Sequence, residues 1–168
     1  MKMNLARILK HLFFLDWQMH RDFPTKSLRK IEEAIATVEQ NHAGEIRFVV
    51  EGSLEGLPLF MGKSARERAI EVFSLLRVWD TQHNNGVLVY VLLADRAVEI
   101  VADRAIHLYA GSRTWQGICH TMEAAFANSQ FQAGAIEGIS LIAQTLASYF
   151  PGQGKQSNEL PDAPVLLN

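Results

Sequence analysis

The 168-residue chain is poor in cysteine and contains no long apolar run. Its one cysteine, Cys119, excludes an intramolecular disulfide and a zinc site made of several thiolates. No apolar stretch approaches the ~20 residues of a membrane-spanning helix, and the N-terminal residues lack the apolar core and cleavage site of a signal peptide. We therefore expect a cytoplasmic protein without a transmembrane span, and we leave open a peripheral position at the inner membrane.

Motifs of three large groups of enzymes are also missing. The chain contains no GxxxxGKS/T loop for phosphate, no GxGxxG loop for dinucleotides and no GxSxG nucleophile elbow. Cys119 and His120 are neighbours in a helical pattern, and neighbouring helical side chains point about 100° apart, so they make a poor nucleophile–base pair. These absences predict no organic cofactor and leave the catalytic residues unassigned.

Charge is unevenly distributed along the chain. The net charge of −2 gives no indication of nucleic-acid binding. Residues 1–30 hold seven Lys or Arg and two acidic residues, a net charge of +5. Residues 31–168 hold nine basic and sixteen acidic residues, a net charge of −7. The chain therefore has a basic front and an acidic body.

The basic front contains an amphipathic pattern over residues 4–17. Apolar residues follow helical spacing there and the basic side chains lie off this stripe, which consists of Leu5, Ile8, Leu9, Leu12 and Phe13. Two arrangements fit the pattern: the helix packs on its own domain, or it lies on an anionic membrane. Because Asp16 and Asp22 dilute the basic face, we predict that the domain largely covers the stripe.

The remaining patterns predict a mixed α/β domain. Helices are expected near residues 24–40, 64–76, 104–110, 114–128 and 132–149, and strands at 45–51, 86–93 and 97–102. The run GVLVYVLL is apolar throughout, which is typical of a central strand buried on both faces. A helix joins the first two strands, so they should be parallel, and the third strand should return antiparallel through a turn at Asp95 and Arg96.

The expected fold class is therefore α/β, a three-layer α/β/α sandwich with a small mixed sheet and an extra N-terminal amphipathic helix. Three segments follow from this assignment. Residues 1–22 form the basic amphipathic helix, residues 23–151 form the α/β/α domain, and residues 152–168 form a C-terminal tail.

Polar residues gather where the first two strands begin and the third strand ends. Oxygen-bearing side chains and the C-termini of helices meet at this edge, and both favour a hard cation, calcium or magnesium. Turn formation by Asp and Asn is the alternative explanation. We expect the metal ligands to be Asp103, Asp80, Thr81, Asn85 and Glu45, with His42 nearby.

The opposite edge, where the parallel strands end, has fewer polar residues. Asp95 and Arg96 are accounted for by the hairpin turn. Residues 52–62 form a loop whose apolar run 57–61 either packs inside, as we expect, or forms a patch for a partner. Substrate or partner contacts are expected at Asn84, His83, His107, Leu57 and Phe60.

Several segments, taken in order, resemble the TPM domain family. The resemblance spans about residues 25–162, and the stretches 42–51 and 78–85 are similar to a bacterial soluble subgroup. It rests on Gly44-Glu45-Ile46-Arg47, Ala65, Ala69, Phe73, Thr81, Asn85-Gly86-Val87-Leu88, Asp95-Arg96, the segment from Ile100 to Ile106, Trp115, Phe126, Phe131, Gly138, Phe150-Pro151 and the segment from Asn158 to Asp162.

The resemblance implies an α/β/α sandwich. Some family members are described as acid phosphatases, and some bind calcium in loops beside the sheet. Many bacterial members carry a membrane anchor and are associated with LemA-type membrane proteins. In this chain the turn from Asp80 to Asn85 and the residue Asp103 match the polar pattern of the family.

Two functions from different classes are compatible with these observations. We expect a TPM-domain protein of unassigned activity that is a cation-stabilised interaction module and acts with a membrane-associated protein partner. The alternative is a divalent-metal-dependent acid phosphatase. In that enzyme Asp103 and Asp80 would hold the metal, Asn84 and Asn85 would orient a phosphomonoester, and a histidine would be the general acid. The sequence leaves the oligomeric state unassigned.

Overall fold

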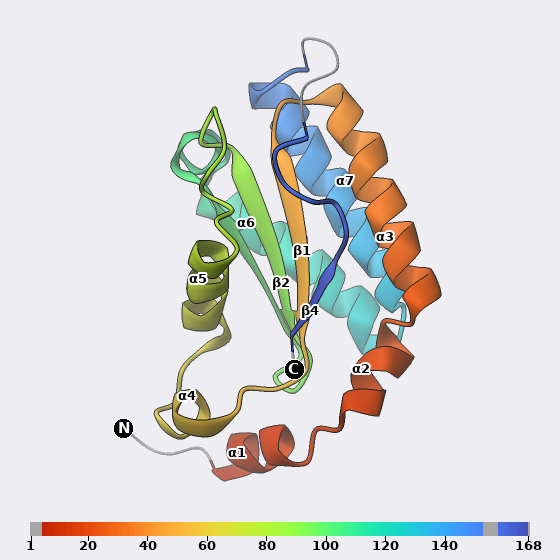
Figure 1. Cartoon of the computed structure of the whole chain (residues 1–168), viewed down its shortest axis with the longest axis vertical. Helices are drawn as coiled ribbons and strands as arrows, with labels where there is room; N and C mark the ends of the chain where they lie inside the picture. The colour runs from red at the N-terminus through yellow and green to blue at the C-terminus, as the bar shows by residue number, and fades with distance from the viewer. Residues whose placement is uncertain (1–4, 153–157, 168) are drawn as a thin grey trace.

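The computed structural model describes residues 5–152 and 158–167 and contains a four-stranded mixed sheet (Figure 1). The strand order is β3-β2-β1-β4. Strands β1 (Glu45–Glu51) and β2 (Gly86–Leu92) are parallel, and β3 (Ala97–Ala102) is antiparallel to β2. Strand β4 (Val165–Leu167) pairs in parallel with the other side of β1. The predicted α/β class is confirmed.

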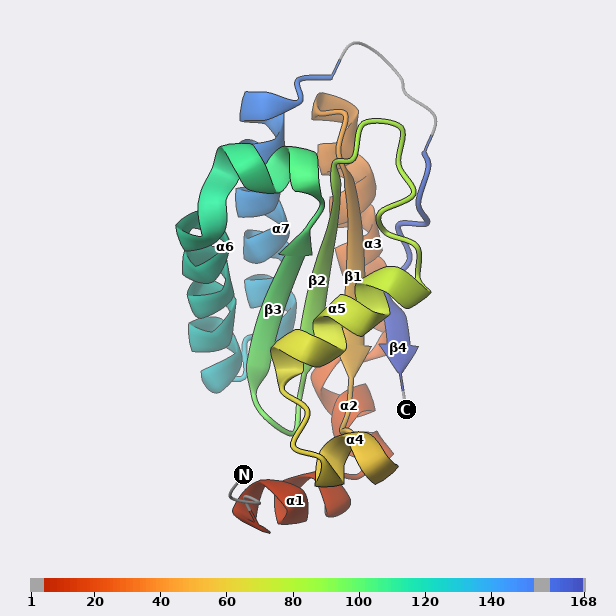
Figure 2. The same cartoon turned by 90° about the vertical axis from the view of Figure 1, so that its left-hand side faces the viewer.

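Helices cover both faces of the sheet (Figure 2). One face packs against α3 (Thr25–Val38), α6 (Arg104–Ala127) and α7 (Phe131–Tyr149), and the other packs against α5 (Ala65–Leu75). Strand β2 is buried along its whole length, as predicted. Its valines 87, 89 and 91 face the three-helix layer, and its residues 88, 90 and 92 face α5. This arrangement is compatible with the expected three-layer sandwich.

Local sequence signals explain where two helices begin and bend. Helix α5 starts with a capping box, in which Ser64 Oγ accepts the Glu67 N–H and the Glu67 carboxylate accepts the Ser64 N–H. Helix α6 starts at Asp103, whose Oδ1 accepts the Arg104 N–H. Gly111, with φ of 75°, interrupts α6 in a conformation that glycine adopts easily. The two separate helices expected from residues 104 and 114 are therefore present as the parts of α6 before and after Gly111.

The single helix expected over residues 4–17 is wrong. The N-terminal arm contains two helices, α1 (Leu5–Leu12) and α2 (Asp16–Asp22), and Asn4 lies outside the described residues. Leu15 separates the helices because its backbone is extended and its N–H donates to the side chain of Gln18 in the first turn of α2. The helical spacing of apolar residues therefore continues across the non-helical residues between α1 and α2.

Two further elements were not expected. The segment 52–62 contains a short helix, α4 (Gly56–Phe60), and the expected tail supplies β4. Arg47 on β1 donates hydrogen bonds to the carbonyl oxygens of Pro161 and Ala163, which draws the C-terminal segment alongside β1. A three-residue strand carries too little periodicity to be found from the sequence alone. A 3-10 helix, Glu39–Asn41, follows α3.

Among residues 5–152 and 158–167, no helix combines the length and the apolarity that a membrane crossing requires.

Candidate functional site

The structure brings together three of the predicted ligands where β2 begins and β3 ends. The N–H of Asn85 donates to Thr81 Oγ1 at 3.2 Å, and the Asn85 side-chain amide donates to the carbonyl of Ala43 at 2.8 Å. The N–H of Asp103 donates to the carbonyl of Gly86 at 2.9 Å, which places Asp103 beside the start of β2. Thr81, Asn85 and Asp103 are all buried.

Two oxygen atoms at this edge are buried without a hydrogen-bond partner in the described part of the chain, Asn85 Oδ1 and Asp103 Oδ2. A buried acceptor left unpaired destabilises a protein by about 1–3 kcal/mol. An amide oxygen and a carboxylate oxygen are ligands that calcium and magnesium prefer. However, residues 5–152 and 158–167 contain no group of three or more His, Cys, Asp or Glu that could hold a metal ion. A cation here would therefore depend on hydroxyl, amide and carbonyl oxygens beside Asp103.

His42, just before β1, is another buried polar residue. Neither of its ring nitrogens has a hydrogen-bond partner among the described residues. Burial lowers the pKa of His42, so the imidazole is neutral at pH 7. Neutral imidazole can bind a metal or accept a proton, whereas a charged ring at this position would be destabilising.

The other predicted residues of this edge lie apart or are engaged elsewhere. Asp80 is exposed, and its carboxylate forms an ion pair with Arg77 at 2.9 Å. His83 and Asn84 are exposed, and His107 is half-buried. Glu45 Oε2 accepts the N–H of Leu160, so this carboxylate faces the C-terminal segment.

An acidic cluster that the sequence analysis missed lies beside Glu45. The pKa of Glu39 is raised to about 9, chiefly by burial; the carboxylates of Glu45 and Asp162 contribute to the increase, and the hydrogen bond from the N–H of Ile46 opposes it. Burial also raises the pKa of Glu45, with added repulsion from Glu159 and Asp162. No sequence pattern connects the end of α3 with the C-terminal segment, so only the fold reveals this cluster.

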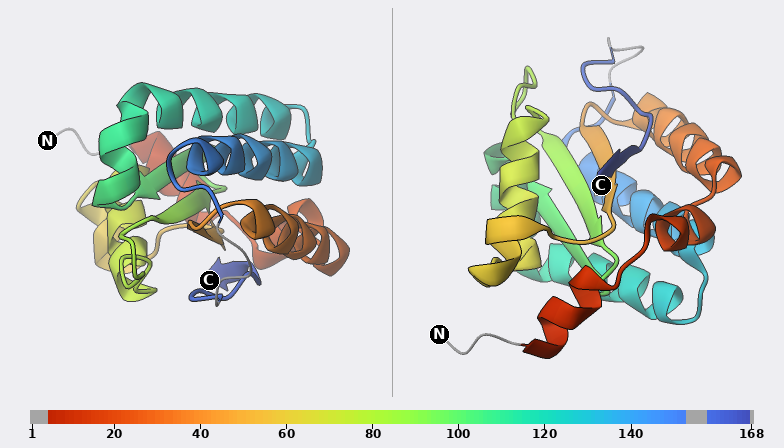
Figure 3. Two further views of the ribbon diagram at one scale, coloured as in Figure 1. Left: turned by 90° about the horizontal axis from the view of Figure 1, so that it is seen from above. Right: turned by 60° about the horizontal axis from the view of Figure 1, so that its bottom comes forward.

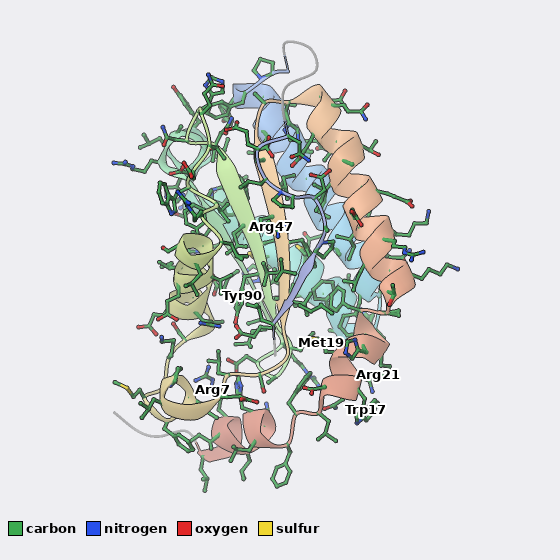
Figure 4. The ribbon with its side chains drawn as sticks, viewed as in Figure 1. Arg7, Trp17, Met19, Arg21, Arg47 and Tyr90 are labelled. Carbon is green, nitrogen blue, oxygen red and sulfur yellow. The ribbon has the colours of Figure 1, made fainter. Side chains whose placement is uncertain are left out.

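At the opposite end of the sheet, Asp95 binds the N-terminal arm (α1 and α2). The Arg7 guanidinium donates to both Asp95 oxygens, at 2.7 to 3.0 Å, and to the carbonyl of Lys63 at 2.8 Å. His11 Nε2 lies 2.9 Å from Asp95 Oδ1, and His11 Nδ1 accepts the N–H of Leu54 at 2.9 Å. In Figure 4 Arg7 lies on the side of α1 that faces the rest of the molecule.

We name Asp95 and the two side chains that bind it, Arg7 and His11, the Asp95 cluster. Burial alone would raise the pKa of Asp95, but the hydrogen bonds from Arg7 and His11 bring that pKa below its ordinary value, so Asp95 is ionised. Because Nδ1 of His11 is an acceptor, the ring proton is on Nε2. The expectation that a tight turn accounts for Asp95 is therefore incomplete, because Asp95 also holds α1 to the domain.

A second buried ionic group lies nearby between the sheet and α5. Arg68 donates to both carboxylate oxygens of Glu51, the closest at 2.8 Å, and the hydroxyl of Tyr90 donates to Glu51 as well. Burial raises the pKa of Tyr90, which keeps the phenol protonated. These groups satisfy one another and leave no reactive side chain. Cys119 is unreactive too, because burial raises the pKa of its thiol to about 12.

Beyond the Asp95 cluster, α1 and α4 lie side by side at one end of the molecule (Figures 1 and 3). Large apolar side chains that are 44% to 75% exposed gather on these two helices and the start of α2. We name this surface the apolar end; it consists of Leu5, Leu9, Leu12, Phe13, Leu15, Trp17, Leu57, Phe60 and Met61. Beneath it, Ile8 and Leu59 are buried in one cluster.

The prediction that the domain covers the stripe of the N-terminal helix holds for Ile8 but is wrong for Leu5, Leu9, Leu12 and Phe13. Arg7 and His11, which lie off the stripe, are the residues that bind Asp95, so α1 turns its apolar side outward. The expectation that residues 57–61 pack inside holds for Leu59 but is wrong for Leu57, Phe60 and Met61.

Comparisons with known proteins give one family and one fold. The family model described as the TPM domain matches residues 23–145. None of the curated proteins matches the chain. The BA42 protein of the psychrophilic bacterium Bizionia argentinensis is 29% identical, with a TM-score of 0.74 over 84% of this chain and 93% of that chain. The N-terminal domain of a P. gingivalis protein is 19% identical, with a TM-score of 0.54 over 69% and 71% of the chains, and shows the fold alone.

Replacing Glu39 with glutamine should change how stability depends on pH. Glu39 ionises near pH 4.5 when unfolded but keeps its proton to about pH 9 when folded. Between these two pH values the native state therefore keeps a proton that the unfolded state has lost. The stability that protonated Glu39 contributes is complete below pH 4.5 and is lost as the pH rises toward 9. Glu39→Gln keeps an acceptor for Ile46, so we expect its melting temperature to exceed the parent's by about 2–4 °C at pH 8 and to match it at pH 4.

The matched control for this substitution is Glu33→Gln, which removes an exposed carboxylate paired with Lys30 on α3. This control should follow the parent at every pH. A Glu39→Gln difference that is the same at pH 4 and pH 8 would contradict the assignment of a protonated Glu39.

Asp95→Asn should release α1. The substitution keeps a turn-forming side chain but removes the charge that Arg7 binds, and hydrogen bonds to charged groups contribute about 1.5–3 kcal/mol. We expect the backbone amides of α1 and Leu54 to exchange with solvent roughly 30-fold faster, with β2 unchanged, as measured by hydrogen–deuterium exchange. Asp80→Asn is the control. Unchanged exchange in α1 would mean that other contacts hold the helix.

Proposed function

Because the chain belongs to the TPM domain family, we propose that it is a cation-stabilised interaction module that acts with a membrane-associated protein partner. The observation that carries this proposal is the apolar end. Monomeric soluble proteins rarely expose large contiguous apolar patches, and such patches mark interaction sites. The side chains of the apolar end come from two segments, α1–α2 and α4, and α1 contacts α4.

The apolar end is held in its exposed orientation. The Asp95 cluster fixes the polar side of α1 against the domain, so exposure of Leu5, Leu9 and Leu12 does not arise from a loose helix. Holding these side chains in place before binding reduces the conformational entropy lost on association. The basic front of the chain favours a partner beside the anionic face of a membrane.

The cation belongs to the opposite end of the sheet in this proposal. Asp103 and Asn85 would supply a carboxylate and an amide oxygen, and Thr81 and backbone carbonyls of the 80–85 turn would complete the shell of a calcium or magnesium ion. Its role would be to fasten the turn before β2 to the start of α6. The unpaired oxygens Asp103 Oδ2 and Asn85 Oδ1 support this assignment.

A second candidate is a divalent-metal-dependent acid phosphatase that uses the same edge. The same two unpaired oxygens favour it, since a metal there could bind a phosphate oxygen. Asp103 and Asp80 would hold the metal, Asn84 and Asn85 would orient the substrate, and His83 or His107 would protonate the leaving group. The ion pair between Asp80 and Arg77 must break for this arrangement, which makes the binding function the better supported of the two.

Calcium should raise the melting temperature in proportion to the logarithm of its concentration once the site begins to fill. Asp103→Asn should remove most of this shift, and it should fold normally because asparagine also caps a helix N-terminus well. Asp16→Asn, on the exposed start of α2, is the control. The absence of any shift with several millimolar calcium, magnesium or manganese would exclude the cation and the metal-dependent phosphatase together.

Leu12→Glu should weaken binding to membranes prepared from the source organism by at least about tenfold, since it places a charge within the apolar end. Leu108→Glu is the control, because Leu108 is 81% exposed on α6, outside the apolar end. Cosedimentation measures both variants, and both should keep the parent's melting temperature.

Two further samples identify the partner in this experiment. Membranes stripped of protein by protease, and protein-free vesicles of the extracted lipids, should both fail to sediment the parent. Equal binding to protein-free vesicles would mean that the protein binds the lipid surface and not a membrane protein. Equal binding of Leu12→Glu and the parent would mean that the apolar end does not bind the partner.

A further inference from the structure

A groove of about 550 Å³ lies between the N-terminal arm and the turn that joins α6 to α7, beside the end of β2. This volume falls in the range of small-molecule sites. The carboxyl ends of parallel strands are also where open α/β sheets usually bind ligands. The apolar part of the groove is formed by Phe13, Phe14, Val91, Leu93, Phe126 and Phe131.

The aromatic wall of the groove is fixed by its own packing. The rings of Phe126 and Phe131 stack with centroids 5.3 Å apart. Behind them the fully buried ring of Phe23 packs against both, with centroids 5.9 and 5.5 Å away. The wall is therefore a preformed apolar surface that can accept a chain without rearrangement.

The charged side chains that line the groove are three basic and two acidic, so their formal charges sum to +1. Arg21 pairs with Asp22 at 2.8 Å, and the Glu123 carboxylate accepts the N–H of Val98 at 3.0 Å. Lys10 and Arg96 line the same groove and form no ion pair within residues 5–152 and 158–167. A ligand that enters the groove thus meets an excess of positive charge.

The turn between α6 and α7 also lies at the groove. The last carbonyls of α6 accept N–H groups from the turn, at residues 128, 129 and 130. The first N–H groups of α7 receive no side-chain cap, because Gln130 makes no capping hydrogen bond. Some of the last carbonyls of α6 are therefore paired, and the positive end of α7 begins at Phe131, on the wall of the groove, next to the negative end of α6 at Ala127.

We propose that this groove binds an amphipathic anion, with its apolar chain against Phe14, Phe126 and Phe131 and its carboxylate or phosphate at Lys10 and Arg96. The inference goes beyond the proposed function, since it requires neither the cation nor the protein partner. Such an anion has two sources, a free fatty acid or a membrane lipid. Lys10 and Phe13 lie on α1 and its C-terminal extension, beside the apolar end, so a chain could enter from either source.

Calorimetric titration with dodecanoate below its micelle concentration tests the proposal, with dodecanol and acetate as comparators. Dodecanoate should bind, dodecanol should bind at least about tenfold more weakly, and acetate should not bind measurably. Equal affinity for dodecanoate and dodecanol would overturn the anion site, and binding of neither chain would overturn the groove as a site.

Two substitutions test separately whether the positive charge and the shape of the groove are needed for binding. Arg96→Asn should weaken dodecanoate binding by about tenfold. Its control is Arg77→Asn, since Arg77 is also an exposed arginine at positive φ, 53° against 54° for Arg96, but lies outside the groove. Ala127→Trp should fill the groove and abolish binding while every charge is kept. Parent-like binding by both Arg96→Asn and Ala127→Trp would place the ligand elsewhere and overturn the proposal.

Two further experiments identify the source of the ligand and test this proposal independently of the proposed function. Monomeric dihexanoyl phosphatidylglycerol that displaces dodecanoate identifies a phospholipid as ligand, whereas dodecanoate binding that it leaves unchanged identifies the free acid; both results support the groove. Leu12→Glu should keep dodecanoate binding, and Ala127→Trp should keep membrane binding. Each proposal can therefore fail without the other.

Discussion

Asp95 joins two parts of the chain that are more than eighty residues apart, and the whole carboxyl end of the sheet is arranged around this contact. Its two oxygens accept hydrogen bonds from Arg7 and His11, and His11 in turn accepts the N–H of Leu54 at the start of the segment that leads to α4. Arg7 also reaches the carbonyl of Lys63, after α4. One carboxylate therefore fixes α1, α4 and the hairpin turn relative to one another. An apolar stripe directed to solvent is costly in water, and these polar contacts are what hold it there.

The two ends of the sheet differ in what remains unsatisfied. At the carboxyl end the buried charges are paired, as in the contacts of Glu51 with Arg68 and Tyr90, and the unsatisfied feature is apolar surface. At the other end the unsatisfied features are polar, namely the oxygens of Asn85 and Asp103, and Glu39 keeps its proton there. This contrast supports a division of roles, in which one end binds partners or an amphipathic ligand and the other is stabilised by protons or a cation.

The sequence predicts those features that depend on residues close together along the chain. The continuous apolar run predicts β2, the Asp95–Arg96 turn predicts the β3 pairing, and that hairpin brings Asn85 and Asp103 to one edge. Helical periodicity shows that α1 has an apolar side but cannot show which side faces the domain. That choice is made by the contact between Arg7 and Asp95, for which no local pattern exists. The acidic cluster of Glu39 and Asp162 and the pairing of β4 escape prediction for the same reason, because both join segments distant in sequence.

The protonation of His11 tests the central contact most directly. A nitrogen-15 correlation spectrum of the imidazole rings at pH 7 distinguishes the two neutral tautomers and the charged ring. The account predicts that His11 carries its proton on Nε2, directed at Asp95, with Nδ1 unprotonated and accepting the N–H of Leu54, and that its signals differ from those of the exposed His20. A proton on Nδ1, or averaged signals like those of His20, would contradict the arrangement of α1 on which the account depends.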